Sequence, residues 1–531
     1  MTPSQGACTG VIDQKIDLLV IGAGASGASV AYEATRRGLR VALLEAGDIG
    51  CATSCRSSKM LHGGVRYLEL AFKTFDLAQL SLVREALMER AHWIEQAPFL
   101  AQPFELALPA ANCFEKAYYG VGLGLYDALS GQRSIGNSRL LSKTQIHQAL
   151  PLLRAGVNGG VAYSDGQFND ARLNLLIALT AERAGAILRS NCRVVALEHR
   201  ADGQLCGAIS ETSMGEQEHW RASVVVNATG MQADSLRKMA DANIAPRMLT
   251  SRGVHVVLEA NLCPEGIGLL LPATDDGRVL FLLPFYGRTL VGTTDTACKL
   301  NEACAPSQAE QHYLIEYVKR WFPDLGQPIV KSCWAGGRPL LKPAGKAINS
   351  SRVVREHEVE TLPCGLISVM GGKWTTCRPM ALDTLKAMET LLGRAMPTPS
   401  ALPLLGAAQN PALTQTLLLE QQQQLRQLLP ETPIQDQQIA HLQASYGLEA
   451  LALIEKNSAK QLEPLSDVIP ICEAEIDRAI NQEHARTPTD VLARRCRLAM
   501  VDMSEAQRLL PVVQEHLAHA DLPKGELDLQ H

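Results

Sequence analysis

The stretch from Asp17 to Asp48 constrains the fold of this chain more than any other part of the sequence. It opens with a short, branched apolar run, Leu18 to Ile21, which is typical of a strand buried on both faces of a parallel sheet. A glycine turn, a helix and a second strand, Val41 to Leu44, follow. This order predicts that the chain begins with a βαβ unit of an α/β domain.

The turn of this unit has the spacing of a dinucleotide-binding loop, with glycines at Gly22, Gly24 and Gly27. In such loops the first glycine permits the tight turn, the second lets the main chain approach a pyrophosphate, and the third lets helix and strand pack closely. Free N–H groups at the helix start favour the same phosphate. Glu45 stands at the end of the second strand, where an acid can bind a ribose. We therefore expect a dinucleotide, although the motif alone does not separate FAD from NAD.

Composition excludes several classes of protein. The 531 residues are 46% hydrophobic and 20% charged, an ordinary globular composition with room for two or three domains. A net charge of −5 and the lack of a basic cluster with interleaved aromatics argue against a nucleic acid partner. The 14 cysteines show no zinc-ligand spacing, so no metal is expected. Cys51 and Cys55 are expected to be free thiols, with a redox pair as the alternative.

Hydropathy gives no apolar run of the roughly 18 residues that a membrane span requires. Residues 1–16 are polar and hold no arginine, so a frayed tail is expected there. The glycine-rich stretch from Ala117 to Leu129 fits either a helix lying on a membrane surface or a core helix, and the sequence leaves both open.

The segment from Cys51 to Glu69 follows the second strand and is rich in Ser, Thr and Gly. Its hydroxyls and amides can line the phosphates and ring edge of a flavin, and Gly63 with Gly64 lets the backbone pass close to a flat ring. By composition alone, a solvated connection is an equal alternative.

Within this segment the string from Ser57 to Glu69, SSKMLHGGVRYLE, resembles the signature of the FAD-dependent glycerol-3-phosphate dehydrogenases, in particular the quinone-linked aerobic type. The resemblance continues in the family's order over about residues 16 to 385. Its further motifs are Tyr163-Ser164-Asp165 with Asp170-Ala171-Arg172-Leu173, Asn227-Ala228-Thr229-Gly230, Gly292-Thr293-Thr294-Asp295, Gly337-Arg338-Pro339-Leu340 and Gly371-Gly372-Lys373-Trp374-Thr375-Thr376. A weaker match, Thr487 to Leu498, places the family's helical C-terminal domain at the end.

The resemblance implies an α/β fold with a glutathione-reductase-like Rossmann domain for FAD, an inserted antiparallel-sheet substrate domain and a C-terminal helical domain. Alternating branched residues from Met248 to Asp295 independently predict the antiparallel sheet. The expected parts are a tail over 1–16, the FAD-dependent oxidoreductase domain over 17–392, a linker over 393–411 and the helical domain over 412–531. Within 17–392, FAD-binding parts are expected at about 17–75, 155–235 and 350–392, and substrate-domain parts at about 76–154 and 236–349. The Pro- and Ala-rich linker is expected to be extended and poorly packed.

Motif and resemblance together imply a set of FAD contacts drawn from several strand ends and loops. The expected FAD-binding residues are Gly22, Gly24, Ala25, Ser26, Gly27, Glu45, Ala46, Thr53, Ser54, Ser57, Ser58, Lys59, His62, Gly63, Gly64, Val194, Ala228, Thr229, Gly230, Gly372, Lys373, Trp374 and Thr375.

Oxidation of an alcohol that carries a phosphate needs a group that takes the hydroxyl proton and cations that hold the phosphate. On sequence alone His255 is more readily a structural histidine, but the resemblance places it in the active site. A guanidinium suits phosphate because it donates in a bidentate fork. The resemblance therefore implies His255, Arg338 and Lys373 as catalytic residues. It implies Arg66, Tyr67, Arg338, Arg355 and Thr375 as substrate-binding residues.

The implied reaction is oxidation of sn-glycerol 3-phosphate to dihydroxyacetone phosphate, with hydride passing to FAD and electrons then to a membrane quinone. The implied location is cytoplasmic, peripheral on the inner face of the cytoplasmic membrane, with a homodimer as one option. An FAD-dependent oxidase of a 2-hydroxy acid or amine and a catalytically lapsed flavin-binding protein are the alternatives. An NAD enzyme is disfavoured because the serine-rich loop and GGKWTT suit a buried flavin better.

Overall fold

The computed structural model describes residues 10–64, 77–264, 266–271, 274–342 and 356–530. The chain divides into two compact units, each assembled from three stretches of sequence. Unit 1 comprises Met1–Cys55, Asn174–Ser251 and Arg338–Leu405. Unit 2 comprises Arg56–Leu173, Arg252–Gly337 and Gly406–His531.

Unit 1 is built on an eight-stranded sheet whose main path runs β17-β18-β10-β1-β2-β7. From β18 to β7 neighbouring strands pair in parallel, whereas β17 pairs with β18 antiparallel. β8 and β9 extend β10 as an antiparallel meander. The strands are β1 (Gly10–Ile21), β2 (Val41–Leu44), β7 (Ile187–Arg189), β8 (Cys192–His199), β9 (Leu205–Thr212), β10 (Gln217–Asn227), β17 (His357–Thr361) and β18 (Leu366–Gly371).

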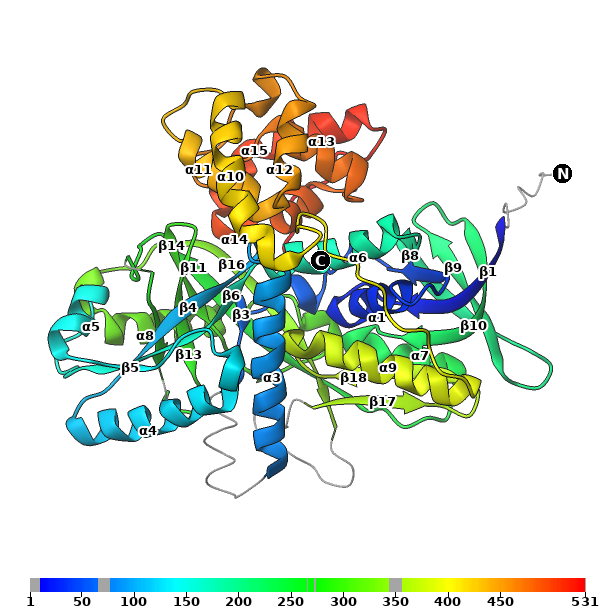
Figure 1. Cartoon of the computed structure of the whole chain (residues 1–531), viewed down its shortest axis with the longest axis horizontal. Coiled ribbons are helices and arrows are strands. Elements are labelled where there is room, and N and C mark those ends of the chain that lie inside the picture. The colour runs from blue at the N-terminus through cyan, green and yellow to red at the C-terminus, as the bar shows by residue number, and fades with distance from the viewer. Residues whose placement is uncertain (1–9, 65–76, 265, 272–273, 343–355, 531) are drawn as a thin grey trace. The chain divides into compact units, whose positions relative to one another are not determined.

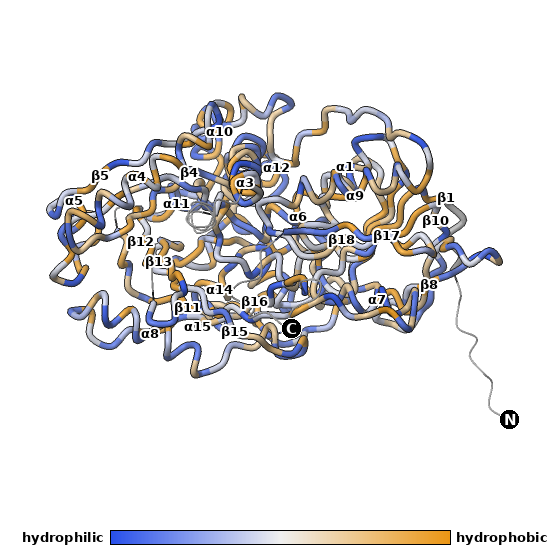
Figure 2. The backbone as a smooth tube through the Cα atoms, turned by 90° about the horizontal axis from the view of Figure 1, so that it is seen from below, coloured by the Kyte–Doolittle hydropathy of each residue, from blue (hydrophilic) through white to orange (hydrophobic). Residues whose placement is uncertain are grey.

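The parallel part of this sheet is apolar on both faces. Leu18, Leu19 and Val20 of β1 are fully buried, as expected for a parallel strand that is covered on both sides. Figure 2 shows hydrophobic stretches, in orange, along the strands near β1 and β10. Among the helices of this unit, α1 packs against α9. The helices are α1 (Ala25–Thr35), α7 (Ala233–Ala240), α9 (Cys377–Leu392) and α6 (Asp170–Arg183), whose first residues belong to unit 2.

Two expectations about the ends of the FAD-binding part are corrected. β1 begins at Gly10, where it already pairs with Glu218 of β10, so residues 10–16 form a strand and the frayed-tail prediction is wrong for them. β10 is long enough to offer this extra backbone partner, which the sequence of the tail does not reveal. Residues 1–9 lie outside the described part of the chain.

The middle of the expected linker, from Ser400 to Leu404, is packed rather than loose. The Ser400 N–H and hydroxyl both bond to the Arg36 carbonyl oxygen, at 2.7 and 2.9 Å. The hydroxyl of Tyr32 in α1 bonds to the Leu402 carbonyl, and the Leu404 side chain is 2% exposed. Residues 400–404 have no regular secondary structure, but they are hydrogen-bonded to α1 and to Arg36 directly after it. The prediction of poor packing is therefore wrong for these residues.

Unit 2 contains a ten-stranded sheet with the main path β15-β11-β14-β13-β12-β4-β6-β3. The described pairs are antiparallel except for β12 with β4, which confirms the antiparallel sheet predicted from the alternating segment. Two strands, β11 and β16, contain a unit boundary. The strands are β3 (Met60–Leu61), β4 (Ala101–Pro109), β5 (Arg139–Leu141), β6 (Gly160–Phe168), β11 (Met248–Leu258), β12 (Gly268–Leu271), β13 (Leu280–Phe285), β14 (Arg288–Gly292), β15 (Thr296–Ala297) and β16 (Val330–Leu341).

The C-terminal helices of unit 2, yellow to red in Figure 1, share a core with this sheet. Leu106 of β4 and Tyr163 of β6 belong to the same buried cluster as Leu498 and Val501 near the C-terminus. The helices of unit 2 are α3 (Leu77–Gln96), α4 (Cys113–Ser130), α5 (Lys143–Ala149), α8 (Gln308–Trp321), α10 (Thr414–Leu428), α11 (Gln435–Tyr446), α12 (Glu449–Glu455), α13 (Glu473–Gln482), the π-helix η10 (Asp490–Arg495), α14 (Leu498–Val501) and α15 (Met503–His519). The C-terminal helices therefore pack against the ten-stranded sheet of unit 2.

Helix α4 covers the stretch for which the sequence left two interpretations open. Tyr118, Val121 and Leu125 are 53%, 68% and 41% exposed, so α4 is not a core helix along this face. Tyr126, on the opposite face, is fully buried. Across the described residues, no helix is both long and apolar enough to cross a membrane.

Candidate active site

The glycine loop after β1 packs so closely against backbone that Gly22 and Gly27 leave no room for a side chain. A Cβ added at Gly27 would lie 1.8 Å from the Gly22 carbonyl oxygen. At Gly22, where φ is +102°, it would lie 2.7 Å from the Ala228 carbonyl oxygen at the end of β10. Gly24 is the N-cap of α1 and supplies no capping side chain. A helix start of this kind presents N–H groups and the positive end of its dipole to an anion.

Two polar side chains fix the chain beside this loop. The Glu45 carboxylate accepts hydrogen bonds from the Ala23 N–H at 2.8 Å and the Gly47 N–H at 3.0 Å. The Ser54 hydroxyl accepts the Ala25 N–H at 2.9 Å. Burial raises the pKa of the Glu45 carboxyl, and the two amide hydrogen bonds oppose that rise. Glu45 is thus held rigidly at the end of β2.

Two further strand ends reach the same loop. The Ala228 N–H, just after β10, donates to the Ile21 carbonyl at 2.8 Å. After β18, the Trp374 indole N–H donates to the Ser54 carbonyl at 3.2 Å. Gly372 has φ +82°, and a Cβ there would lie 2.5 Å from the Met380 sulfur. Carboxyl ends of parallel strands meet at one edge of a sheet, which is where α/β folds bind nucleotides.

Unit 1 therefore holds the larger part of the predicted cofactor set. Its members are Gly22, Gly24, Ala25, Ser26, Gly27, Glu45, Ala46, Thr53, Ser54, Val194, Ala228, Thr229, Gly230, Gly372, Lys373, Trp374 and Thr375. Val194 is a buried residue within β8 rather than at a strand end. Arg338 also belongs to unit 1, at its boundary within β16. The predicted residues Arg66, Tyr67 and Arg355 lie outside the described residues.

Unit 2 holds His255 and the cofactor residues Ser57, Ser58, Lys59, His62, Gly63 and Gly64. His255 is 3% exposed, and its Nε2 lies 2.9 Å from the Ser58 hydroxyl. Its ring stacks on Trp334 of β16, with centroids 4.2 Å apart and planes 21° apart. A Cβ at Gly292, opposite His255 in the sheet, would lie 2.2 Å from the His255 Cδ2 atom. The glycine of the Gly-Thr-Thr-Asp motif thus makes room for the imidazole.

Asp170 organises the segment that carries Ser58. Its Oδ2 accepts the Ser57 N–H at 2.9 Å, the Ser57 hydroxyl at 2.8 Å and the Lys59 ammonium at 2.7 Å. Burial raises the pKa of the Asp170 carboxyl, but Lys59 and Arg497 outweigh it, so the pKa falls below its usual value. Lys59 has φ +60°, and its ammonium lies 4.6 Å from the Trp334 ring. The ammonium that was predicted to contact FAD is therefore paired with a buried carboxylate.

A second buried network holds the Gly63 backbone. The Tyr126 hydroxyl accepts the Gly63 N–H at 2.8 Å and lies 3.1 Å from both Asp165 carboxylate oxygens. Arg90 of α3 pairs with Asp165 at 2.7 Å. A Cβ at Gly63 would lie 2.6 Å from the Tyr126 hydroxyl and 2.5 Å from Leu87. Packing against Tyr126 and Leu87 thus favours glycine at position 63, independently of the expected approach of its backbone to a flavin ring.

Sequence reasoning assigned no role to Asp170, Asp165 or Trp334. The two acids stood inside motifs that carried the family resemblance, and that position was the available signal. Trp334 and Arg90 offered none, because their partners are distant in the chain.

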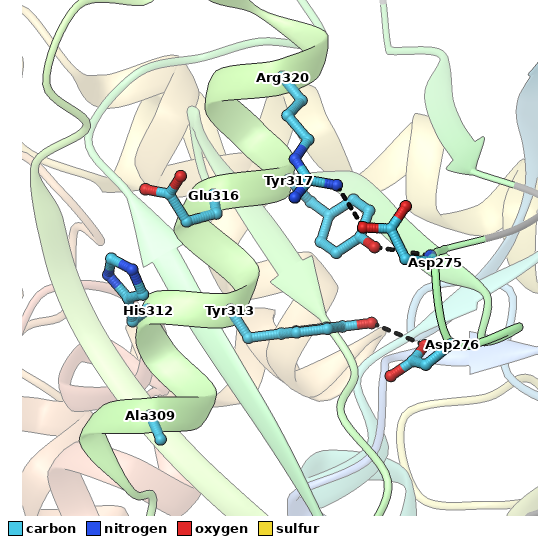
Figure 3. Close-up of a pocket in the computed structure, with 8 residues that line it drawn as sticks. All are labelled: Asp275, Asp276, Ala309, His312, Tyr313, Glu316, Tyr317 and Arg320. Carbon is cyan, nitrogen blue, oxygen red and sulfur yellow. Dashed lines mark hydrogen bonds and ion pairs between the residues drawn. The ribbon is translucent and has the colours of Figure 1, made fainter.

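Two other kinds of site, a metal site and a surface pocket, were considered among the described residues. Among the described residues, no group of three or more His, Cys, Asp or Glu side chains could hold a metal ion, and the described cysteines are free thiols. A hollow of about 430 Å³ lies between α8 and the turn at Asp275 and Asp276 (Figure 3). Its polar groups bond to one another: the Tyr317 hydroxyl accepts the Asp275 N–H, and the Tyr313 hydroxyl donates to Asp276. None of the predicted site residues lines it.

Comparison with known proteins decides between FAD and NAD. Residues 17–378 match the FAD dependent oxidoreductase family, and residues 398–520 match the C-terminal domain of alpha-glycerophosphate oxidase. The mitochondrial glycerol-3-phosphate dehydrogenase of Homo sapiens is 37% identical over 518 residues, which cover 94% of this chain and 70% of that protein. The chain belongs to the family of FAD-dependent glycerol-3-phosphate dehydrogenases.

Further glycerol-3-phosphate dehydrogenases match this chain over most of its length. The mitochondrial enzyme of Arabidopsis thaliana is 38% identical over 524 residues, covering 95% of this chain and 82% of that protein. The glycerol-3-phosphate dehydrogenase of Bacillus halodurans, solved in complex with FAD, matches with a TM-score of 0.75 at 26% identity. That match covers 96% of this chain and 91% of the other. The chain has the expected FAD-dependent oxidoreductase fold with a C-terminal helical region.

The family fixes the dinucleotide as FAD rather than NAD, and the residues of unit 1 fit it. Gly24, the N-cap of α1, supplies no capping side chain, and an added Cβ there would lie 3.0 Å from the Ser54 hydroxyl that accepts the Ala25 N–H. Two main-chain N–H groups hold the Glu45 carboxylate at the end of β2.

Proposed function

We propose that this protein oxidises sn-glycerol 3-phosphate to dihydroxyacetone phosphate and delivers the electrons to a membrane quinone. The observation that carries the proposal is the buried His255, bonded to Ser58, in a chain 37% identical to an enzyme named glycerol-3-phosphate dehydrogenase. FAD, when bound, supplies the hydride acceptor. The chain itself must hold the substrate and take one proton.

In this proposal the residues divide these tasks. His255 takes the proton of the C2 hydroxyl as the carbon–hydrogen bond breaks, since imidazole is a base near neutral pH. Arg338, with Arg66, binds the phosphate through forked hydrogen bonds. Lys373 polarises the hydroxyl or the flavin edge. Tyr67, Arg355 and Thr375 complete the proposed substrate contacts.

Anaerobic reduction of the bound flavin tests the substrate and the phosphate contact together. Glycerol 3-phosphate should bleach the flavin absorbance rapidly, whereas glycerol, which lacks the phosphate, should act poorly. Arg338→Ala should lower the ratio of the reduction rate with glycerol 3-phosphate to the rate with glycerol by about tenfold or more, because a charge-assisted phosphate contact is lost. Arg200→Ala, at a side chain 60% exposed, is the control and should leave the preference unchanged. Bleaching by 2-hydroxy acids or amines in place of glycerol 3-phosphate would refute the substrate assignment.

The match to the C-terminal domain of alpha-glycerophosphate oxidase supports a second candidate, an oxidase that passes electrons to oxygen. Reoxidation of the reduced protein separates the two. If the acceptor is a quinone, a soluble quinone analogue should reoxidise the flavin much faster than air, and little peroxide should form. One peroxide per substrate at full speed in air would identify an oxidase.

We also propose that the protein is peripheral on the inner face of the cytoplasmic membrane, attached through the 117–129 segment. Exposed apolar side chains on α4, Tyr118 and Val121 among them, support this. A Tyr118→Ser, Val121→Ser double variant should lose sedimentation with anionic vesicles. Met214→Ser, at a side chain 85% exposed in unit 1, should not. Unchanged sedimentation of the α4 variant would refute this anchor. The proposed homodimer is checked by light scattering of the purified protein.

A further inference from the structure

We propose that Arg497, in the C-terminal helical segment, is a positioning residue of the active site. Through Asp170 it holds the segment Ser57–Lys59 in place, and with it the hydrogen bond between Ser58 and His255. The catalytic part of this inference rests on the proposed function. The C-terminal segment would then complete the active site.

Arg497 lies between the π-helix η10 and α14. Its backbone is left-handed, with φ +70°, and its side chain is 1% exposed. One guanidinium nitrogen donates to the Ala493 carbonyl at 3.2 Å, and the other lies 3.3 Å from Asp170 Oδ1. A non-glycine residue rarely adopts this conformation, so the surrounding structure must hold it. Here that conformation coincides with a buried ion pair to a residue more than three hundred positions earlier in the chain.

The two oxygens of Asp170 face different parts of unit 2. Oδ1 accepts the Ala171 N–H at 2.9 Å and pairs with Arg497. Oδ2 takes all three hydrogen bonds from Ser57 and Lys59. Anchoring Oδ1 therefore fixes the rotation of the carboxylate, and that rotation presents Oδ2 to the segment that precedes His62. Lys59, also left-handed and 2% exposed, pairs with this carboxylate.

The C-terminal segment makes a second buried ion pair with the start of α6, between Glu483 and Arg172. Glu483 accepts two hydrogen bonds from the Arg172 guanidinium, at 2.6 and 3.1 Å, and a third from Arg478 at 3.2 Å. This pair secures α6 but does not contact Ser57 or Lys59. Arg497 is thus the C-terminal residue whose described ion pair leads to the segment carrying Ser58.

Asp170 is connected to the proposed base, His255, through the three consecutive residues Ser57–Lys59. Ser57 and Lys59 flank Ser58, whose hydroxyl bonds His255 Nε2 at 2.9 Å. Because the three residues are consecutive, a change in the Asp170 contacts alters the backbone that aims the Ser58 hydroxyl. Loss of Arg497 should therefore loosen this segment while leaving the sheet intact.

Hydrogen exchange of the holoprotein, followed by mass spectrometry, tests the positioning without any substrate. In Arg497→Met, peptides covering residues 56–64 should exchange about tenfold faster, because the opening of a local segment sets its exchange rate. Arg494→Met is the matched control, since Arg494 is a buried arginine of the same turn whose carboxylate partner is Asp490. It should leave the exchange of 56–64 unchanged. Equal protection of 56–64 in wild type and Arg497→Met would overturn the proposal.

Flavin reduction supplies the second readout. Arg497→Met should slow reduction at saturating substrate by about tenfold to a hundredfold, as expected for a displaced reacting group, with little change in the half-saturating substrate concentration. Arg497→Lys should recover part of that rate and of the protection, and it replaces the Met variant if that variant does not fold. Equal slowing by Arg494→Met would show a merely structural role. Failure of wild type to react with glycerol 3-phosphate would refute the proposed function, whereas the exchange result judges the positioning separately.

Discussion

The glycines of the loop after β1 meet backbone atoms, which cannot move aside as a flexible side chain can. Gly27 faces the Gly22 carbonyl, and Gly22 faces the carbonyl of Ala228. Gly63 is different because its neighbours are the side chains of Tyr126 and Leu87. At the scale of single residues, the same amino acid therefore serves two purposes: close approach of two backbones in unit 1 and room for a phenol in unit 2.

Gly27→Ala is expected to lose both stability and FAD. A Cβ placed 1.8 Å from a carbonyl oxygen forces the loop and α1 apart, which should cost about 3 kcal/mol or more. Urea unfolding and the flavin retained after desalting measure the two effects. Gly124→Ala, where nothing lies within 4 Å of the added Cβ, is the control. Normal FAD content in Gly27→Ala would contradict the close-packing argument.

Tyr126→Phe is expected to destabilise unit 2 by about 1–3 kcal/mol, because a buried N–H and a buried carboxylate lose a shared hydroxyl. The hydroxyl lies between the Gly63 N–H and Asp165, and burial already raises the pKa of the Asp165 carboxyl. Urea unfolding of the variant gives the cost. A change of less than a few tenths of a kcal/mol would show that water replaces the phenol at no cost.

Helix α4 shows how one element can have two unlike faces. Val121 and Tyr118 are exposed, whereas Tyr126 reaches a buried hydrogen-bond network. Its glycines at 122 and 124 have no atom within 4 Å of an added Cβ. They are therefore not sites of close helix packing within the described part of the chain.

Replacing both glycines by alanine, Gly122→Ala with Gly124→Ala, is expected to stabilise the protein. Alanine favours a helix over glycine by about 1 kcal/mol at each position, and an added Cβ meets no atom within 4 Å at either. Thermal and urea unfolding measure the gain. A loss of stability would mean that another surface packs closely against α4 at these positions, and the same variant would then be expected to change the oligomeric state.

Across the whole molecule, buried charges join segments that are far apart in sequence. Burial raises the pKa of the Glu483 carboxyl, but Arg172, Arg478 and Arg495 outweigh it and lower the pKa to about 2 from 4.5. Glu483 lies just after α13 and Arg172 in α6, so this cluster ties the C-terminal helices to the middle of the chain.

Acid should weaken the ion pairs between Glu483 and its arginine partners. Since the folded pKa of Glu483 is below its unfolded value, the stabilisation is complete above about pH 4.5 and is lost as the pH falls toward 2. The shift corresponds to about 3 kcal/mol. Urea unfolding at several pH values should show stability falling over this range, and Glu483→Gln should flatten that fall. Glu515→Gln, an exposed acid on α15, should keep the wild-type slope. An unchanged slope in Glu483→Gln would show that other carboxylates control acid unfolding.

The sequence by itself determined the elements whose signals are local. The strand Val41–Leu44 and the apolar run Leu18–Ile21 lie in strands as predicted, because an apolar run beside a glycine turn specifies its own conformation. The helix start at Thr487 was also readable, since its hydroxyl accepts the Asp490 N–H at 3.2 Å. FAD and the reaction class followed from the family resemblance, which motifs contiguous in the chain carry.

Tertiary structure alone decided what pairs across long separations. The strand start at Gly10, the packed segment at Ser400, the stacking of His255 on Trp334 and the pairing of Asp170 with Arg497 have no local signal. The physical reason is that local periodicity reports which face of an element is buried. Which distant charge, ring or backbone then meets that face depends on how the whole unit closes around it.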